Sequence, residues 1–307
     1  MRNSGLPDTY FEYPFRGKRL DHPWFKPRFL SDIPKVTLPD GCNLAIWIVM
    51  SVEHFPIDMS GLPFMPLGGM KRPSPSYWDY TQRDYGNRIG VYRLMEIFDR
   101  HGIKPDIVAN IAALERYPEL VHEFSGRGLE IIGGGNDMAH LHHSGLSFEE
   151  ELAMVSNCVD RFIKLTGQRP GGWMCPDSSI SMNTFDVLKR CGFNYTLDMN
   201  NDELPFIINT NNGDLIALPL DRELSDKRVM FEFSQQSEEF AKQVEDACDF
   251  LLQEAQEKGG RILTLNLTPW ISGQPFRVEV ISNLLAFLKS RDKTVFMNAQ
   301  RILEFFN

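Results

Sequence analysis

Short apolar runs alternate along this chain with longer segments whose apolar residues recur every three or four positions. The runs predict buried strands at 43–52, 105–109, 129–133, 171–175, 194–198, 215–220 and 261–267. The spaced segments predict amphipathic helices, with faces formed by Leu152, Val155, Val159 and Phe162, by Phe240, Val244, Ala247 and Leu251, and by Val280, Leu284 and Phe287. Strand followed by helix, repeated about seven times, predicts parallel strands joined by right-handed crossovers.

Residues typical of helix starts and helix ends support this alternation of strands and helices. Ser147 with Glu150 has the spacing of a capping box, and helix ends are predicted at Gly102, Gly167 and Gly192. An open doubly wound sheet is the rival architecture, but no GxGxxG follows the first strand. The pattern therefore favours a barrel.

Two segments lack periodicity. Residues 1–40 are rich in proline and aromatic residues and predict an extended arm that wraps the domain or covers a neighbouring subunit. Residues 41–307 then form a single barrel domain. Within it, 56–82 is long, rich in proline and glycine and without a period, which predicts a lid or rim over a pocket.

Five predicted strands end in polar or glycine-rich segments: Glu53-His54, Gly133 to Asp137, Cys175-Pro176-Asp177, Asp198, and Thr268-Pro269-Trp270. In barrels of alternating strands and helices, active sites are built from the loops at the carboxyl ends of the strands. These segments therefore predict one pocket assembled from the whole chain, which is the layout of an enzyme.

The strand-end residues suggest specific chemistry. Burial of Glu53 would raise its pKa toward the range of a general base, although Glu53 and His54 could instead only bind backbone. Arg83, Asp84 and Arg88 are expected around the start of a helix, where Asp84 is either a cap or part of a clamp for a carboxylate or ureide-like group.

Other candidates have equally open interpretations. Gly135 and Asn136 lie in a glycine run that could approach a ligand closely or simply make a tight turn. His140, His142 and His143 could bind metal but lack the helical spacing of a zincin. Cys175 is a nucleophile only if a histidine lies beside it, and is otherwise a small packing residue.

Composition narrows the class of partner. The apolar fraction is 42%, the charged fraction 24% and the net charge -9, with no basic run. Nucleic acid and anionic membranes are therefore disfavoured. The first twenty residues contain no apolar leader, and the five scattered cysteines lack CxxC spacing, so we expect a cytoplasmic protein.

The motifs together resemble the polysaccharide deacetylase (NodB-homology) superfamily, and within it the cytoplasmic allantoinase-like branch. The matching segments are 52–55, 83–88, 166–173, 198–205 and 269–277. The resemblance implies a distorted (β/α)7 barrel that hydrolyses amide or ureide C–N bonds. Typical members bind a metal through an Asp pair and a His-x-x-x-His, and have a histidine in the last strand motif.

This chain departs from that pattern. Glu53-His54 stands at the first motif, Gly134 and Met138 at the third-strand positions, and Thr268 at the final histidine. Neither Gly nor Met is a suitable zinc ligand, and Thr cannot act as an acid at neutral pH. We therefore expect no cofactor and an altered, metal-poor site, with His54, His140 and His142 as the remaining candidate ligands.

Two functions remain open. In a metal-free hydrolase of a small amide or ureide, Glu53 would activate water, Asp198 would hold the substrate amide, and Arg83 or Arg277 would stabilise the oxyanion. The alternative is an inactive barrel that binds a small ligand or a partner chain. Homo-oligomers are expected from the arm. The remaining substrate-binding candidates are His54, Asp84, Arg88, Gly135, Asn136, Trp173, Cys175, Thr268 and Trp270.

Overall fold

The computed structural model describes residues 22–59 and 75–306. Within these ranges one nine-stranded sheet forms, in the order β6-β7-β5-β4-β3-β2-β1-β8, with β9 paired to β1. All neighbouring strands are parallel except β6 and β7. The strands are β1 (Leu44–Val52), β2 (Asp106–Ala109), β3 (Ile131–Gly133), β4 (Gly172–Trp173), β5 (Tyr195–Thr196), β6 (Phe206–Thr210), β7 (Gly213–Ala217), β8 (Arg261–Leu267) and β9 (Thr294–Phe296).

Helices follow most of the strands. They are α1 (Tyr77–Tyr85), α2 (Val91–His101), α3 (Ile111–Arg116), α4 (Glu119–Gly126), α5 (Phe148–Thr166), α6 (Thr184–Arg190), α7 (Ser237–Lys258), α8 (Pro269–Ser272), α9 (Val278–Ser290) and α10 (Ala299–Phe306). Two π-helical segments, η4 (Gly86–Gly90) and η6 (Lys227–Glu232), and the short 3-10 turns η2 (Leu30–Asp32), η3 (Pro39–Gly41) and η5 (Pro176–Ser178) complete the order.

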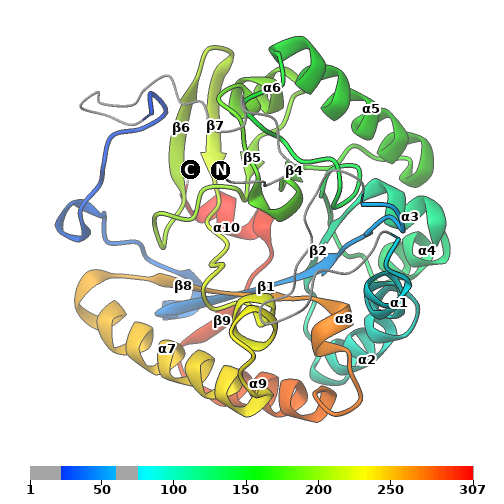
Figure 1. Cartoon of the computed structure of the whole chain (residues 1–307). Coiled ribbons are helices and arrows are strands. Elements are labelled where there is room, and N and C mark those ends of the chain that lie inside the picture. Colours follow the sequence, from blue (N-terminus) through cyan, green and yellow to red (C-terminus); the bar gives the residue numbers. More distant parts are fainter. Residues whose placement is uncertain (1–21, 60–74, 307) are drawn as a thin grey trace, which may run out of the picture.

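The sheet is curled, and most helices lie along its outer side, whereas α10 lies on its inner side (Figure 1). The alternation of side chains along β1 explains how the sheet contacts α10 on its inner side and the other helices on its outer side. Ala45, Trp47 and Val49 belong to the inner cluster with Ile302 of α10, and the intervening residues of the strand pack in the outer cluster with the helices. Burial on both faces is typical of parallel strands in α/β folds and accounts for the continuous apolar run.

Residues 22–43 lie along the open side of the sheet, between its edge strands β6 and β8. The carbonyl of Trp24 accepts hydrogen bonds from the backbone and side-chain nitrogens of Asn209, and the carbonyl of Val36 accepts one from Gly260 N. Residues 1–21 of the predicted arm and 60–74 of the predicted lid lie outside the described residues. The roles given to both segments stay predictions.

The observed order of strands confirms the barrel-type fold. Strands β1 to β5 follow one another across the sheet, and β8 returns beside β1, so the sheet is wound in one direction. All seven predicted strands are present, and Ser147 caps α5 through the expected capping box with Glu150. Gly102 and Gly167 end their helices in the left-handed conformation, as predicted.

Three expectations were wrong or incomplete. β6 and β9 were missed, and β6 forms an antiparallel hairpin with β7 rather than a parallel repeat. Asn211-Asn212-Gly213 marks that hairpin turn in the sequence, since Asn and Gly tolerate the turn's backbone angles. The buried face of α9 is also shifted, because Ile281, Leu285 and Leu288 lie deeper than Val280 and Phe287.

The third expectation that was wrong concerns Arg83 and Asp84, which lie in the last turn of α1 rather than around the start of a helix. Ser76 caps α1 eight positions before Asp84 by accepting a hydrogen bond from Asp79 N. The helix then continues through η4, where a Cβ on Gly86 would collide with the backbone of Trp270 and one on Gly90 with the carbonyl of Pro269. These two glycines allow α8 to dock against η4.

Candidate functional site

Glu53 follows β1 directly and has the best-defined contacts of the candidate site residues. Its side chain continues the alternation that turns Trp47 and Val49 toward the inner cluster, and it is only 7% exposed. Glu53 Oε1 lies 3.3 Å from Lys227 Nζ, and Trp270 Nε1 donates to Oε2 at 3.0 Å. The main chain is fixed as well, because Asn87 Nδ2 donates to the Glu53 carbonyl at 2.8 Å. A buried carboxylate is thus held in one orientation by a cation and an indole.

Lys227 forms an ion pair with Glu53, and sequence reasoning did not identify it. Its ammonium group also lies 3.3 Å from Asp177 Oδ1, which accepts a hydrogen bond from Arg222 Nη2 at 3.1 Å. Burial alone would lower the pKa of Lys227, but the Glu53 and Asp177 carboxylates raise it above its ordinary value. Lys227 is therefore a stable ammonium group at the centre of the site.

Asp226, immediately before Lys227, is fully buried and was also missed. Its Oδ2 accepts hydrogen bonds from Thr268 N and Ser272 Oγ, both at 2.6 Å. Burial raises the pKa of Asp226 to about 7, and the nearby Glu53 charge acts in the same direction. The segment Ser225-Asp226-Lys227 lies in the polar exit after β7, so the strand-end rule applied to the other strands would have found it.

The wall beside Glu53 is aromatic and cationic. The guanidinium carbon of Arg83 lies 4.6 Å from the centre of the Phe55 ring and 5.1 Å from that of Trp270, and the side chain is 2% exposed. Arg83 Nη1 donates to the Asp79 carbonyl at 2.7 Å. Arg277 Nη1 donates to the Ile271 carbonyl at 3.1 Å, and burial lowers the pKa of Arg277. The structure thus brings Arg83, Trp270 and Glu53 together, as expected.

Asn110 ties the exits of β1 and β3 to each other. Its Oδ1 accepts a hydrogen bond from His54 N at 2.7 Å, and its Nδ2 donates to the Gly134 carbonyl. A Cβ on Gly134 would lie 2.8 Å from Ala109 backbone atoms, so the backbone approach leaves no room for a side chain there. His54 is partly buried, and this burial lowers its pKa despite the Asp137 charge.

The glycine run turns tightly and then forms a hydrogen-bonded loop. Gly135 has φ +77°, and its carbonyl accepts from Ile111 N at the start of α3. Asn136 Oδ1 accepts from Arg161 Nη1 at 2.6 Å, and Asn136 Nδ2 donates to Asp137 Oδ2 at 2.7 Å. The described side-chain contacts of Asn136 are with its own loop and α5, and its carbonyl accepts from Ala112 N of α3, which fits the structural alternative for this segment.

The histidines of the same loop point in different directions. His140 is 60% exposed and pairs with Asp137 Oδ1 at 2.7 Å. His142 is buried, with Nδ1 2.6 Å from Glu151 Oε1, and Glu151 also accepts hydrogen bonds from Ser181 and Thr184. Although burial opposes it, hydrogen bonding to His142, Ser181 and Thr184 lowers the pKa of Glu151. His142 therefore belongs to a buried polar network with Glu151, Ser181 and Thr184.

Asp198 and Cys175 lie together where β4 and β5 end. Asp198 Oδ1 accepts from Cys175 N at 2.8 Å, and Oδ2 accepts from Thr196 Oγ1 at 2.7 Å. Burial raises the pKa of Asp198, and it raises that of the Cys175 thiol well above its usual value. Trp173 packs in the outer cluster against Phe193 and His142. The described hydrogen bonds of Asp198 hold the strand exits together, whereas Glu53 is held by Lys227 and Trp270.

Asp84 and Arg88 form a second polar group near the rim. Arg88 Nε donates to Asp84 Oδ2 at 2.8 Å, the Tyr117 hydroxyl donates to Asp84 Oδ1, and Arg116 lies 3.6 Å from the same oxygen. The carboxylate is thus surrounded by donors from η4 and from the end of α3. Arg88 is half-exposed and remains accessible to a ligand.

The residues present do not fit the metal site of typical family members. Thr268 is buried at the position of the final histidine, no side chain fits at Gly134, and Met138 offers only a thioether. Within residues 22–59 and 75–306, no group of three or more His, Cys, Asp or Glu side chains could hold a metal ion. A zinc site needs three protein ligands, and this donor set does not supply them.

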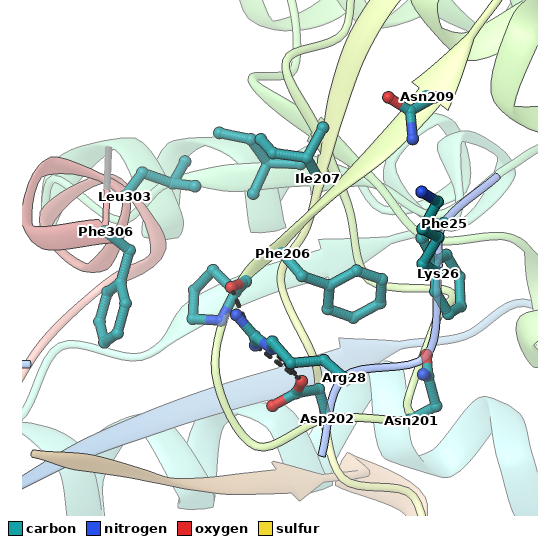
Figure 2. Close-up of a pocket in the computed structure, with 12 residues that line it drawn as sticks. Phe25, Lys26, Arg28, Asn201, Asp202, Phe206, Ile207, Asn209, Leu303 and Phe306 are labelled. Atoms are coloured by element: carbon teal, nitrogen blue, oxygen red, sulfur yellow. Dashed lines mark hydrogen bonds and ion pairs between the residues drawn. The ribbon is translucent and has the colours of Figure 1, made fainter. Parts of the chain in front are cut away.

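A separate cavity of about 490 Å³ lies on the open side of the sheet, between residues 25–28, β6 and α10 (Figure 2). Phe25 and Phe206 face each other edge to face, and Arg28 pairs with Asp202 at 2.7 Å. The residues lining this cavity do not include any of the side chains that the sequence nominated for the site. The cavity and the Glu53 site are distinct features.

The fold is that of a barrel-type α/β protein, with a buried carboxylate at a strand exit. No family model matches the chain. It is 22% identical over 225 residues, 68% of its length and 70% of the relative's, to a Schizosaccharomyces pombe protein named "Putative polysaccharide deacetylase". It is 30% identical over 119 residues to the peptidoglycan deacetylase-like protein FGM2 of Gibberella zeae, covering 38% of this chain and 35% of that one.

Solved structures similar to this chain include proteins of the same kind as the sequence relatives. PuuE allantoinase matches with a TM-score of 0.80 and 23% identity, covering 92% of this chain and 97% of that one. A probable polysaccharide deacetylase from Pseudomonas aeruginosa PAO1 matches with 0.79 and 22%, covering 92% and 98%. Sequence and structural relatives thus both point to the polysaccharide deacetylase (NodB/CE4) superfamily, which confirms the resemblance and the fold. The cytoplasmic branch stays a prediction.

In the part of the chain that the structure describes, no helix is long and apolar enough to cross a membrane. The predicted cytoplasmic location, small-molecule partner, homo-oligomer and absence of a cofactor remain predictions.

Proposed function

We propose that this protein hydrolyses a non-peptide C–N bond, an amide or ureide, in a small molecule, and that it does so without the metal of typical superfamily members. The proposal rests on the Glu53 carboxylate, which is held at the exit of β1 between the Lys227 ammonium and the Trp270 indole. The named relatives, deacetylases and an allantoinase, support hydrolysis of this bond class.

In the proposed reaction Glu53 acts as general base. Its two oxygens offer about four lone-pair sites, of which Lys227 and Trp270 use two, so a water molecule can still donate to the carboxylate. Glu53 takes one proton from this water as the oxygen attacks the substrate carbonyl. The proton then passes to the departing nitrogen as the C–N bond breaks, which leaves a carboxylic acid and an amine from an amide, or a carboxylic acid and a urea group from a cyclic ureide.

The negative charge of the tetrahedral intermediate needs a fixed donor. Lys227 Nζ lies 3.3 Å from Glu53 Oε1 and is therefore close to a water bound by this carboxylate, so we assign it this role. Arg83 and Arg277 were the earlier candidates, but each donates to a backbone carbonyl in the described structure. We place both in the walls of the site, where their charges favour an electron-rich substrate. Asp198 retains its proposed role in holding the substrate amide through the β4–β5 exits.

The test is a screen of small N-acetyl compounds and cyclic ureides with the parent protein, Glu53→Gln and Glu257→Gln. Glu257 is exposed on α7, so its variant makes the same chemical change away from the site. We expect Glu53→Gln to lower kcat by about 10²–10⁴-fold while the ligand still binds, and Glu257→Gln to match the parent. Full activity in Glu53→Gln would refute the assignment.

A specific observation favours the alternative of an inactive ligand-binding barrel. Both Glu53 oxygens already have donors, Lys227 Nζ and Trp270 Nε1, so the carboxylate is occupied before any water or substrate binds. A ligand that raises the melting temperature of the parent protein but is not hydrolysed would establish this alternative and refute the hydrolase.

A further inference from the structure

The two donors that hold Glu53 come from segments that meet at a single buried side chain. Lys227 is the first residue of η6, directly after Asp226. Trp270 lies in α8, two residues after Thr268, and Ser272 ends that helix. Asp226 Oδ2 accepts from Thr268 N and Ser272 Oγ at 2.6 Å each, so it joins η6 to both ends of α8.

We propose that Asp226 is the positioning residue of the site: its Oδ2 clamps α8 to η6 and thereby keeps both Trp270 Nε1 and Lys227 Nζ on the Glu53 carboxylate. Only the catalytic consequence of this clamp rests on the proposed function. The clamp itself concerns the orientation of three side chains and is independent of any substrate.

The other contacts between these segments do not set the direction of the indole N–H. Phe231 of η6 packs edge to face on Trp270 with ring centres 4.8 Å apart, and Phe55 packs on it at 6.4 Å. Apolar packing of this kind is weakly directional. Hydrogen bonds at 2.6 Å to a fully buried oxygen are directional, and loss of the acceptor leaves buried donors unsatisfied, which is unfavourable.

The clamp has to hold in either protonation state of Asp226, since burial raises the pKa of this group to about 7. The charged groups around it are Glu53 from β1, Lys227 beside it on η6 and Arg277 after α8. Because both donors reach the same oxygen, a neutral carboxyl group whose carbonyl occupies that position still accepts both hydrogen bonds, although more weakly than the carboxylate does. An asparagine amide oxygen satisfies the same requirement.

The test uses the Trp270 indole N–H as reporter in two-dimensional nitrogen–proton spectra of protein labelled at its five tryptophans. Trp270→Phe assigns the signal, and Glu53→Ala gives its position without the carboxylate acceptor. We expect Asp226→Ala to move the Trp270 signal toward that position while the other four indole signals stay. Asp226→Asn is expected to leave all five in place.

Ser272→Ala provides a second, milder variant in case Asp226→Ala does not fold. It removes one of the two hydrogen bonds to Oδ2, and we expect a smaller shift of the Trp270 signal in the same direction. An unmoved signal in whichever of these variants folds would overturn the proposal. Equal displacement in Asp226→Asn and Asp226→Ala would overturn it too, because charge and not an acceptor oxygen would then be responsible. The spectra need no substrate, so this result is separate from the success or failure of the hydrolase assignment.

Discussion

Trp270 donates its indole N–H to the Glu53 carboxylate at 3.0 Å across 217 positions of sequence. The contact joins the exit of β1 to the exit of β8, two strands that pair in parallel along seven residues. It requires the close approach of α8 to η4 that Gly86 and Gly90 permit. The site is thus an outcome of strand pairing and helix docking together.

Lys227 and Glu53 are expected to be energetically coupled. Lys227→Met leaves a buried carboxylate without its cation, which we expect to lower the free energy of unfolding by about 1–3 kcal/mol. Glu53→Gln in the same background should recover part of this loss. A double-mutant cycle by urea unfolding measures the coupling. Strictly additive effects would show that the pair contributes nothing.

Docking of α8 is expected to fail when η4 gains a side chain. Gly86→Ala places a methyl group against the Trp270 backbone, so we expect about 1–3 kcal/mol of destabilisation and a shifted Trp270 fluorescence spectrum. Gly126→Ala at the end of α4 is the matched control, since a Cβ there meets nothing within 4 Å. Equal stability of the two variants would contradict the close approach.

The two loop histidines are expected to differ sharply. His142→Ala removes the partner of buried Glu151 and should cost about 3 kcal/mol, whereas the exposed His140→Ala should change stability by less than about 0.5 kcal/mol. Urea unfolding of both variants checks this contrast. A neutral His142→Ala together with reduced metal content would instead support a metal role for the loop.

Asp106, below the inner cluster, should make stability depend on pH. Burial raises its pKa to about 7, although its Oδ2 accepts hydrogen bonds from Trp47 Nε1 and Ala299 N. The folded state therefore binds the Asp106 proton more tightly than the unfolded state does. The resulting contribution to the free energy of unfolding is fully present below about pH 4 and is lost as the pH rises toward 7. Asp106→Asn keeps an acceptor oxygen and removes the titration.

The free energy of unfolding of Asp106→Asn is accordingly expected to exceed that of the parent by an amount that grows between pH 5 and pH 8, to at most about 4 kcal/mol. Exposed Asp292→Asn is the control and should follow the parent at both pH values. A constant difference between Asp106→Asn and the parent would show that Asp106 is ionised throughout.

Much of the architecture could be predicted because its physical basis is local. The continuous run at 44–52 predicts a doubly buried strand, and Ser147 with Glu150 predicts a helix start. The β6–β7 hairpin was missed because the exposed edge strand alternates weakly, with Ile208 its one fully buried residue. Strand-end reasoning located Glu53 and Trp270, but it did not extend to the exit of β7.

That omission explains why Lys227, one of the two partners of Glu53, and Asp226 were not anticipated. Lys227 and Asp226 lie in a segment without an apolar run of its own before η6, and their importance comes from contacts 174 and 42 residues away in sequence. Asp198, in contrast, followed a strand as the rule requires, but its described hydrogen bonds are to Cys175 N and Thr196 Oγ1. The position of a residue at a strand end indicates the region of the site. The direction of its side chain determines whether the residue is part of the site.

The most direct test of the account is the hydrolysis rate of a small amide or ureide by untagged protein before and after exhaustive dialysis against a chelator. The account predicts an unchanged rate, because Glu53, Lys227 and Trp270 supply the proposed chemistry without a metal. A rate that vanishes on dialysis and returns with added zinc, iron, nickel or cobalt would contradict it.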